Sequence, residues 1–283
     1  MGEFLHEVNG VSIAGETFGD ANHPPVLLVM GAMASSVWWP GEFCRQLAAR
    51  GRFVIRYDHR DTGRSTSYAP GTATYSSEDL AWDAVALLDR LGVRSAHWVG
   101  MSLGGYLAQM VAAEGPERVR SLTMIASLAL LPPPSPIEAP PMSPEVLAWH
   151  AKAQTLDWKD EAAVLDYQVG AWRLLHGSAY PFDAAHIRAL AEEDYRRTPD
   201  PLTAFNHATL KDREQWADRA RSIRQPALII HGTEDTVLPY AHALALKTAL
   251  PQATLITLEG VGHELPKEEW PRMIEAIARH TAS

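Results

Sequence analysis

The stretch AHWVGMSLGGYL, residues 96–107, decides the fold of this chain. An apolar run ends at Gly100 and a helical pattern begins at Leu103, so Ser102 lies where a strand gives way to a helix. Residues 100–104 match the pattern G-x-S-x-G, in which a sharp strand-to-helix turn presents a serine as a nucleophile. Side chains at the flanking positions would collide with the neighbouring strand and helix, and glycine removes those collisions. A tight turn that holds a serine by accident is the alternative.

The rest of the chain alternates short apolar runs with helical patterns. The apolar runs, which suit buried parallel strands, are residues 25–30, 52–57, 96–99, 122–126, 227–230 and 253–258. The helical patterns are residues 42–50, 78–91, 103–114, 241–250 and 267–280. Residues 11–18 add an alternating strand, and VNGV at residues 8–11 predicts a hairpin turn before it. This order predicts an α/β fold with a mostly parallel sheet and helices on both faces.

One segment breaks the alternation. LALLPPPSPIEAPPMSP, residues 128–144, is too rich in proline to continue a strand or a helix. Helical patterns without a buried strand follow as far as about residue 219, which is too long for ordinary crossover helices. We therefore expect residues 131–219 to form an inserted helical cap, and residues 1–130 and 220–283 to form the core of the α/β fold. We expect a roomy cleft above Ser102 to be bounded by the long apolar side chains of the cap and by its tryptophans, Trp149, Trp158, Trp172 and Trp216.

A serine hydroxyl needs a base within hydrogen-bond reach, and position selects one of the 12 histidines. His263 lies in the loop after the last apolar run, where Gly260 and Gly262 let the backbone turn back towards the edge of the sheet. His59 and His231, near other strand ends, are the alternatives.

The base needs a carboxylate on its far nitrogen to hold the tautomer. Asp235 follows the apolar run at residues 227–230, and His263 follows the next apolar run, at residues 253–258. The order Ser102, Asp235, His263 is the order of the α/β-hydrolase triad. Glu234 is the rival, and its side chain is expected to point away from that of its neighbour.

Attack by the serine produces an oxyanion, which needs two preorganised donors. We expect one from the backbone N–H of Leu103, at the start of a helix, and one from that of Ala32, after Gly31 in VMGAMASS. A simple glycine turn is the alternative for the second loop. In DHRDTGRS, residues 58–65, a structural ion pair that braces the neighbouring loop is favoured over a metal or phosphate site for Asp58, Arg60 and Asp61.

The bulk composition excludes several classes of function. A net charge of -9 argues against nucleic acid or an anionic membrane surface as a partner. Cys44 is the only cysteine, so an intramolecular disulfide and a thiolate metal cluster are ruled out, and no other metal-ligand spacing occurs. The sequence shows neither a signal peptide nor an apolar run long enough for a membrane span. We expect a cytoplasmic monomer or small homo-oligomer that uses neither a cofactor nor a metal.

With these residues in place, the chain resembles the serine hydrolases of the α/β-hydrolase fold along nearly its whole length, the insert excepted. More narrowly, LLVMGAMASSVWWPGEFCRQLA (residues 27–48) and VIRYDHRDTGRST (residues 54–66) are similar to a subgroup with the anthracycline (aclacinomycin) methylesterases and the serine-dependent macrolide esterases. The common hydrolase pattern has His-Gly before the oxyanion residue, whereas this chain has Met30-Gly31, which matches the subgroup. GMSLGG and GVGH identify the catalytic machinery and leave the substrate open.

These observations predict a serine-dependent carboxylic-ester hydrolase that works through an acyl-enzyme. A large polyketide ester or a macrolide-type lactone is the first expectation for its small-molecule substrate, and Met33, Trp38 and Trp172 are the expected contacts, unless they are packed core. An anthracycline-type methylesterase and a generic carboxylesterase are the alternatives, and a cofactor-free haloperoxidase or perhydrolase side activity with the same triad is a further one. From another class, the alternative is a ligand-binding receptor on a hydrolase fold, because fold does not fix function.

Overall fold

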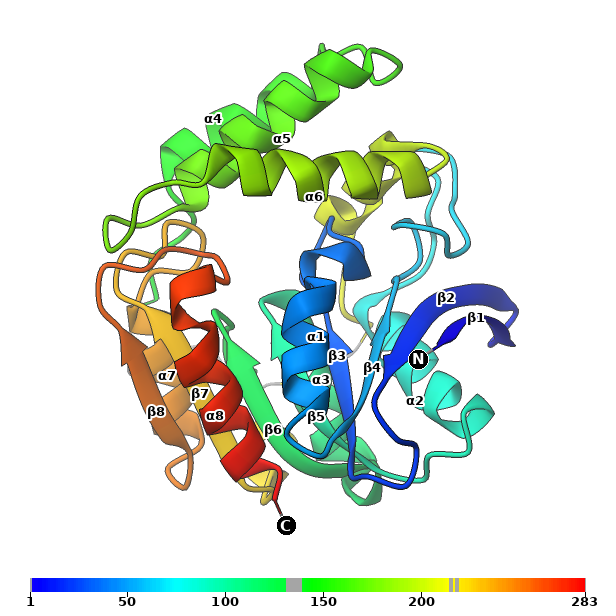
Figure 1. Ribbon diagram of the computed structural model, residues 1–283, viewed down its shortest axis with the longest axis vertical. Helices are drawn as coiled ribbons and strands as arrows, with labels where there is room; N and C mark the ends of the chain where they lie inside the picture. Colours follow the sequence, from blue (N-terminus) through cyan, green and yellow to red (C-terminus); the bar gives the residue numbers. More distant parts are fainter. Residues whose placement is uncertain (1, 131–138, 214–215, 217–218, 283) are drawn as a thin grey trace.

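The computed structural model describes residues 2–130, 139–213, 216 and 219–282, and an eight-stranded sheet forms its centre (Figure 1). The strands are β1 (Gly2–Val8), β2 (Val11–Phe18), β3 (Pro25–Val29), β4 (Phe53–Tyr57), β5 (Ala96–Met101), β6 (Val119–Ile125), β7 (Ala227–Gly232) and β8 (Thr254–Leu258). Their order across the sheet is β1-β2-β4-β3-β5-β6-β7-β8. Strands β3 to β8 are parallel, whereas β2 pairs antiparallel with both of its neighbours. The predicted α/β class and mostly parallel sheet are therefore confirmed.

Helices cover both faces of the sheet, as the alternating pattern predicts (Figure 1). One face carries α1 (Gly41–Ala48) and α8 (Trp270–His280), and the other carries α2 (Ser77–Arg90), α3 (Leu103–Glu114) and α7 (Ala241–Ala249). Because successive side chains of a strand point to opposite faces, β3 contributes to both hydrophobic clusters. Val26 and Leu28 pack on the α1 side, and Leu27 and Val29 pack on the α3 side.

The hairpin between β1 and β2 turns at Asn9 and Gly10, whose φ angles are 49° and 78°. Both are residues that tolerate positive φ, and two such residues in succession give the turn whose twist suits a hairpin. The register pairs Val8 with Val11, so the predicted VNGV turn is confirmed and the strand before it extends the sheet by β1.

The insert consists of the helices between β6 and β7, and its largest members lie above the sheet in Figure 1. They are α4 (Pro144–Ala151), α5 (Glu161–Leu175) and α6 (Ala184–Arg197), followed by the 3-10 segments η4 (Pro201–Thr209) and η5 (Arg219–Ser222). Residues 131–138, at the predicted start of the cap, lie outside the described residues. None of the described helices is long and apolar enough to cross a membrane.

The register of the parallel strands brings their carboxyl ends to one edge, beneath the insert. Val29 of β3 pairs with Gly100 of β5, and Met101 of β5 pairs with Ile125 of β6. The loops that follow these strands therefore leave the sheet side by side. In open sheets with parallel strands, this edge is where ligands bind.

Candidate active site

Ser102 occupies the sharp turn between β5 and α3, with φ 51° and ψ -118°. A positive φ is costly for a residue with a side chain, so the surroundings must hold it. The Ser102 N–H donates to the carbonyl oxygen of Ile125 at 2.9 Å, and its own carbonyl oxygen accepts from Ser127 Oγ at 2.7 Å. Ser127 has no role in the sequence motif, and nothing in its local sequence pointed to this contact.

The glycines around the turn are required by close backbone contact. A Cβ atom at Gly100 would lie 2.2 Å from the carbonyl carbon of Gly104, and one at Gly104 would lie 2.0 Å from the carbonyl oxygen of Val29. A Cβ atom at Gly105 would lie 2.5 Å from Ser127 Oγ. The steric reason expected for Gly100 and Gly104 is present, and Gly105 obeys it as well.

His263 and Asp235 lie at the ends of adjacent strands and form a buried pair. His263 Nδ1 lies 2.7 Å from Asp235 Oδ2, and Asp235 Oδ1 accepts from the backbone N–H groups of Val237 (2.8 Å) and Leu238 (2.7 Å). Burial acts to raise the pKa of Asp235, but the charge of His263 and hydrogen bonds from His231 and His263 outweigh it and lower that pKa well below its usual value. The carboxylate is therefore ionised and aimed at the imidazole, which suits orientation of a base.

The loop of His263 is also fixed from above by the insert. The His263 N–H donates to the carbonyl oxygen of Leu175, the last residue of α5, at 2.7 Å. A Cβ atom at Gly262 would lie 1.9 Å from the same carbonyl oxygen. The sequence suggested only that Gly260 and Gly262 let the chain turn back, and φ of Gly260 is indeed 69°. Position 262 requires glycine because the insert approaches the backbone too closely for a side chain.

The rival residues point elsewhere. Glu234 is exposed, and its carboxylate accepts from the N–H (2.8 Å) and Oγ (2.7 Å) of Ser178. His231 is buried against Asp235 and does not reach the cavity: its Nε2 lies 3.3 Å from Asp235 Oδ2 and 2.7 Å from the carbonyl oxygen of Leu238. His59 is buried beside the loop after β3, with Nε2 3.0 Å from the carbonyl oxygen of Met30. Neither histidine lines the cavity that Ser102 and His263 share.

The two expected oxyanion donors lie next to Ser102. A Cβ atom at Gly31 would lie 3.3 Å from Ser102 Cβ, and Ala32 follows on the wall of the same cavity. Leu103 is the first residue of α3, so its N–H has no acceptor within the helix and lies at the positive end of the helix dipole. The arrangement suits an anion above Ser102, and the two catalytic roles remain predictions.

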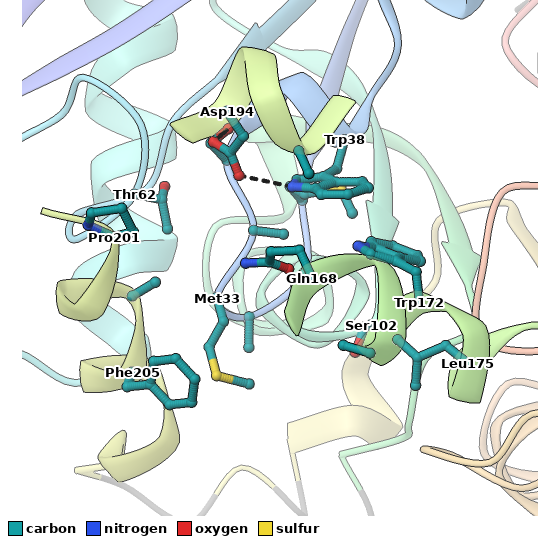
Figure 2. A pocket seen from close by; sticks show the side chains of 18 of the residues that line it. Met33, Trp38, Thr62, Ser102, Gln168, Trp172, Leu175, Asp194, Pro201 and Phe205 are labelled. Carbon is teal, nitrogen blue, oxygen red and sulfur yellow. Dashed lines mark hydrogen bonds between the residues drawn. The ribbon is translucent and has the colours of Figure 1, made fainter. Parts of the chain in front are cut away.

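A cavity of about 250 Å³ opens over Ser102 and His263, between the sheet edge and the insert (Figure 2). The core contributes Met33 and Trp38 to its wall, and the insert contributes Trp172. The Trp38 and Trp172 rings stack with centroids 4.4 Å apart and planes inclined by 23°. All three residues predicted to contact substrate therefore line the cavity, and Trp172 is the more exposed of the two stacked indoles.

The other cap tryptophans do not line this cavity, contrary to the expectation that they would bound it. Trp149 Nε1 donates to the carbonyl oxygen of Tyr167 and Trp158 Nε1 to that of Ala153, so both connect parts of the insert. Trp216 packs in the hydrophobic cluster under α2 and α3. Helical periodicity could not separate these roles, because a tryptophan pattern is equally typical of packing between helices.

Asp194 of α6 is a half-buried residue on the cavity wall that the sequence gave no reason to select. It accepts from Trp38 Nε1 at 2.9 Å and from Ser35 Oγ at 2.5 Å, so it fixes the indole of Trp38 in the cavity wall (Figure 2). Burial raises the pKa of Asp194, although the hydrogen bonds from Ser35 and Trp38 oppose that rise. Its neighbours Glu192, Arg196 and Arg197 are also charged, so the local sequence does not distinguish Asp194 from a solvent-facing residue.

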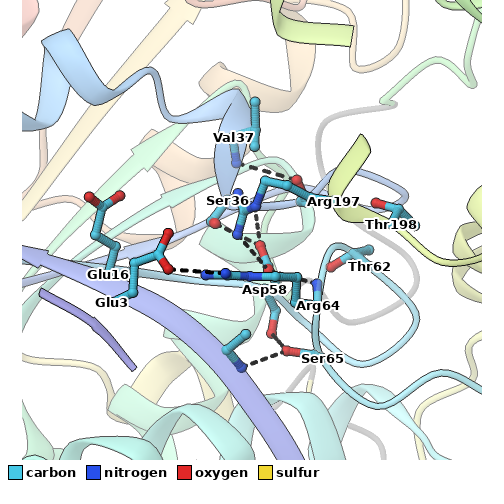
Figure 3. Close-up of polar contacts among 12 residues, drawn as sticks. Glu3, Glu16, Ser36, Val37, Asp58, Thr62, Arg64, Ser65, Arg197 and Thr198 are labelled. Carbon is cyan, nitrogen blue, oxygen red and sulfur yellow. Dashed lines mark hydrogen bonds and ion pairs between the residues drawn. The ribbon is translucent and has the colours of Figure 1, made fainter. Parts of the chain in front are cut away.

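The charged run after β4 braces the loop beside the oxyanion turn, but with partners from outside the run. Asp58 Oδ1 accepts from the N–H and Oγ of Ser36, and Arg197 of α6 forms an ion pair with Asp58 Oδ2 at 3.1 Å (Figure 3). Arg60 instead pairs with Asp83 of α2 at 2.6 Å. The bracing role is as expected, and the partners come from elements that lie far away in the sequence.

Comparisons with known proteins agree with this geometry. Residues 24–269 match the family model of the alpha/beta hydrolase fold. The chain is 36% identical over 285 residues to a rhodomycin D methylesterase of Streptomyces sp. (strain C5), covering 96% of this chain and 95% of the relative. It is 35% identical to a rhodomycin D methylesterase of Streptomyces peucetius with the same coverage. The enol-lactonase from Burkholderia xenovorans LB400 shares the fold, with a TM-score of 0.77, 22% identity and coverage of 99% and 100% of the two chains.

Proposed function

We propose that this chain, which belongs to the α/β-hydrolase family, is a serine esterase that hydrolyses the methyl ester of a carboxylic acid group on an anthracycline-type polyketide. The observation that carries the proposal is the placement of Ser102 and His263 in one cavity with the stacked indoles of Trp38 and Trp172. The similarity to two rhodomycin D methylesterases over 96% of the chain supports the choice of ester.

The reaction follows from the side chains at the sheet edge. Ser102 Oγ attacks the ester carbonyl carbon while His263 Nε2 takes the hydroxyl proton. The N–H groups of Ala32 and Leu103 stabilise the oxyanion, and Asp235 holds His263 Nδ1 and stabilises the imidazolium. The C–O bond to methoxide then breaks, and His263 protonates it to methanol. Water, deprotonated by His263, then attacks the acyl carbon; the bond from that carbon to Ser102 Oγ breaks, His263 returns the proton to Oγ, and the carboxylic acid is released.

The cavity wall favours a flat, apolar substrate. The half-buried Trp172 indole is held by stacking on the buried Trp38, with the ring centroids 4.4 Å apart, and a polycyclic aromatic system can stack on such a fixed ring better than a flexible macrocycle can. The relatives are methylesterases by name, which also favours the methylesterase alternative over the macrolide-type lactone. A large apolar substrate excludes water from the site and strengthens the oxyanion contacts, so it should react faster than a short acyl ester.

The experiment is a substrate panel read by mass spectrometry. Purified protein is incubated with rhodomycin D, a macrolide and p-nitrophenyl acetate, with Ser102→Ala as the control. We expect the methyl ester to lose the mass of one CH₂ with release of methanol, and Ser102→Ala to lower kcat by about 10⁶-fold. A fluorophosphonate should label Ser102.

Each other outcome has a defined meaning. Gain of one water without fragmentation marks lactone opening and would favour the macrolide reading. Turnover of short esters alone would leave a generic carboxylesterase. Binding of the methyl ester without any product would indicate a receptor, and label on another serine would overturn the assignment of Ser102.

A further inference from the structure

We propose that His207, in η4 of the insert, is a positioning residue for the oxyanion hole: it holds the backbone N–H of Met33 and thereby fixes the loop that carries Ala32. The inference rests on the proposed function, because it requires an oxyanion to form at Ser102. It assigns to the insert a part in transition-state stabilisation as well as in substrate binding.

The contact joins segments that are far apart in the sequence. The Met33 N–H donates to His207 Nδ1 at 3.0 Å, across a separation of 174 residues. The other ring nitrogen, Nε2, lies 2.8 Å from the carbonyl oxygen of Arg60. A carbonyl oxygen can only accept, so Nε2 carries the proton and Nδ1 offers a lone pair. The ring is thus held in the one tautomer that can accept from Met33.

The protonation state of the ring supports the same arrangement. His207 is 5% exposed, and burial, together with the nearby His59, lowers its pKa to about 3. The imidazole is therefore neutral near pH 7. A protonated ring would present an N–H to the Met33 N–H and could not hold it.

Met33 is the point at which the loop needs support. Its φ is 61°, a left-handed conformation that is unfavourable for a residue with a side chain. The peptide that bears the Met33 N–H is adjacent to the peptide that bears the Ala32 N–H, so holding one restricts the other. On the other side of Ala32, His59 Nε2 holds the carbonyl oxygen of Met30 at 3.0 Å.

His59 and His207 come from different parts of the molecule, so only a change at His207 tests the contribution of the insert to the oxyanion loop. His59 follows β4 and belongs to the core, whereas His207 belongs to the insert, and their rings meet edge to face at 6.0 Å. Loss of His207 leaves the Met30 contact in place and releases only the Met33 side of the loop. Removing an oxyanion donor lowers kcat about 10²–10³-fold. Displacing the Ala32 N–H from its position should lower kcat by less than that.

The test compares two amide substitutions. In His207→Asn the side-chain oxygen can replace Nδ1 and still accept from Met33, whereas in His207→Gln the amide N–H can replace Nε2 and only the Arg60 contact survives. Four quantities are measured: kcat and KM for p-nitrophenyl butyrate, the affinity for phenylboronic acid, which forms a tetrahedral adduct with Ser102, and the affinity for benzamide, which does not. Thermal unfolding checks each variant.

We expect His207→Gln to lower kcat and boronate affinity about tenfold to a hundredfold, with KM and benzamide affinity little changed. His207→Asn should stay close to wild type. Thr203→Val is the matched control, because it removes a buried hydrogen bond from η4 to the carbonyl oxygen of Asp61 without touching Met33. It should lower Tm and leave boronate affinity unchanged.

Several results would overturn the inference. They are wild-type boronate affinity in His207→Gln, an equal loss in His207→Asn, or an equal loss in Thr203→Val. His207→Leu, which buries no new polar group, gives the same comparison if the glutamine variant does not fold. If wild-type Ser102 forms no boronate adduct at all, the proposed function fails, and that result is distinct from an adduct that is indifferent to His207.

Discussion

The turn that carries Ser102 and the loop that carries His263 reach the same cavity, but different parts of the chain hold them. Ser102 is bonded to Ile125 and packed through Gly104 against Val29, all within the core. The N–H of His263 is bonded to Leu175 of the insert. The Ser102 turn is thus fixed by the sheet, while the His263 loop is fixed jointly by the sheet and by the helices above it. Under the proposed mechanism, in which Ser102 is the nucleophile and His263 the base, the insert therefore helps to position the base.

The largest effect tests the contribution of the sheet to holding His263, which comes from Asp235 after β7. Asp235→Asn should lower kcat by about 10⁴-fold, because the amide favours the wrong tautomer of His263. Glu234→Gln is the matched control, since Glu234 bonds Ser178 at the surface and should matter little. Steady-state kinetics on a methyl ester or on p-nitrophenyl butyrate measures both. Equal losses at the two positions would mean that the acid is misplaced.

The next effect tests the part that the insert holds. In Gly262→Ala the new Cβ atom would lie 1.9 Å from the Leu175 carbonyl oxygen, so the insert and the His263 loop must move apart. We expect kcat to fall about tenfold to a hundredfold, the cost of a small displacement of a catalytic group. Gly41→Ala, which meets only the flexible Arg45 side chain, is the control and should keep wild-type kcat. Wild-type kcat in Gly262→Ala would remove the distinction between the two regions.

A smaller effect concerns binding to the insert. Trp172→Ala removes half of the indole stack, so KM for a polycyclic methyl ester should rise about tenfold while KM for p-nitrophenyl acetate changes little. Trp82→Ala, on α2 and outside the cavity lining, removes the same side chain without touching the site. Similar changes in KM for both esters would show that Trp172 supports the fold and does not discriminate between large and small substrates.

The smallest effect concerns the point where the insert returns to the core. Trp216 Nε1 donates to Glu78 Oε1 at 2.8 Å. Burial acts to raise the pKa of Glu78, but hydrogen bonds from Trp216, Ser76 and the Arg213 N–H lower it to about 2. A lowered pKa stabilises the fold above the ordinary value of 4.5, and that contribution is lost as pH falls towards 2.

Trp216→Phe should therefore lower the free energy of unfolding by about 1.5 kcal/mol near pH 7, with the difference from wild type shrinking below pH 4.5. Urea unfolding across this pH range measures it. Trp158→Phe, which loses a bond to a neutral carbonyl, should show no such dependence on pH. A constant difference for Trp216→Phe would contradict the ionic origin of the effect.

What the sequence could predict follows the same division between sheet and insert. The motif around Ser102, the order of the three candidate triad residues and the position of Ala32 depend on strands and on the turns that end them. Local patterns report such features directly, because the period of a strand or helix and the place of a glycine are written in neighbouring residues.

The contributions of the insert could not be found in this way. His207 lies in FNHATL, which has no feature that separates it from a solvated loop histidine, and Asp194 lies among charged residues of α6. Their partners Met33 and Trp38 are more than a hundred positions away. Only the three-dimensional packing of the insert on the sheet edge reveals which polar side chains of its helices turn inward.

The ion pair between Arg197 and buried Asp58 has a consequence for recombination between hydrolases of this fold. A cap grafted from a relative without a cation at this position would leave the buried Asp58 carboxylate with only its hydrogen bonds from Ser36 and Arg64 of the core, and loss of the ion pair would destabilise the host. A transplanted cap should therefore contain α6 and η4 in full. The core residues that these two segments contact should be exchanged with them. Chimeras joined at the ends of the cap helices would gain a new substrate specificity and lose stability in the core.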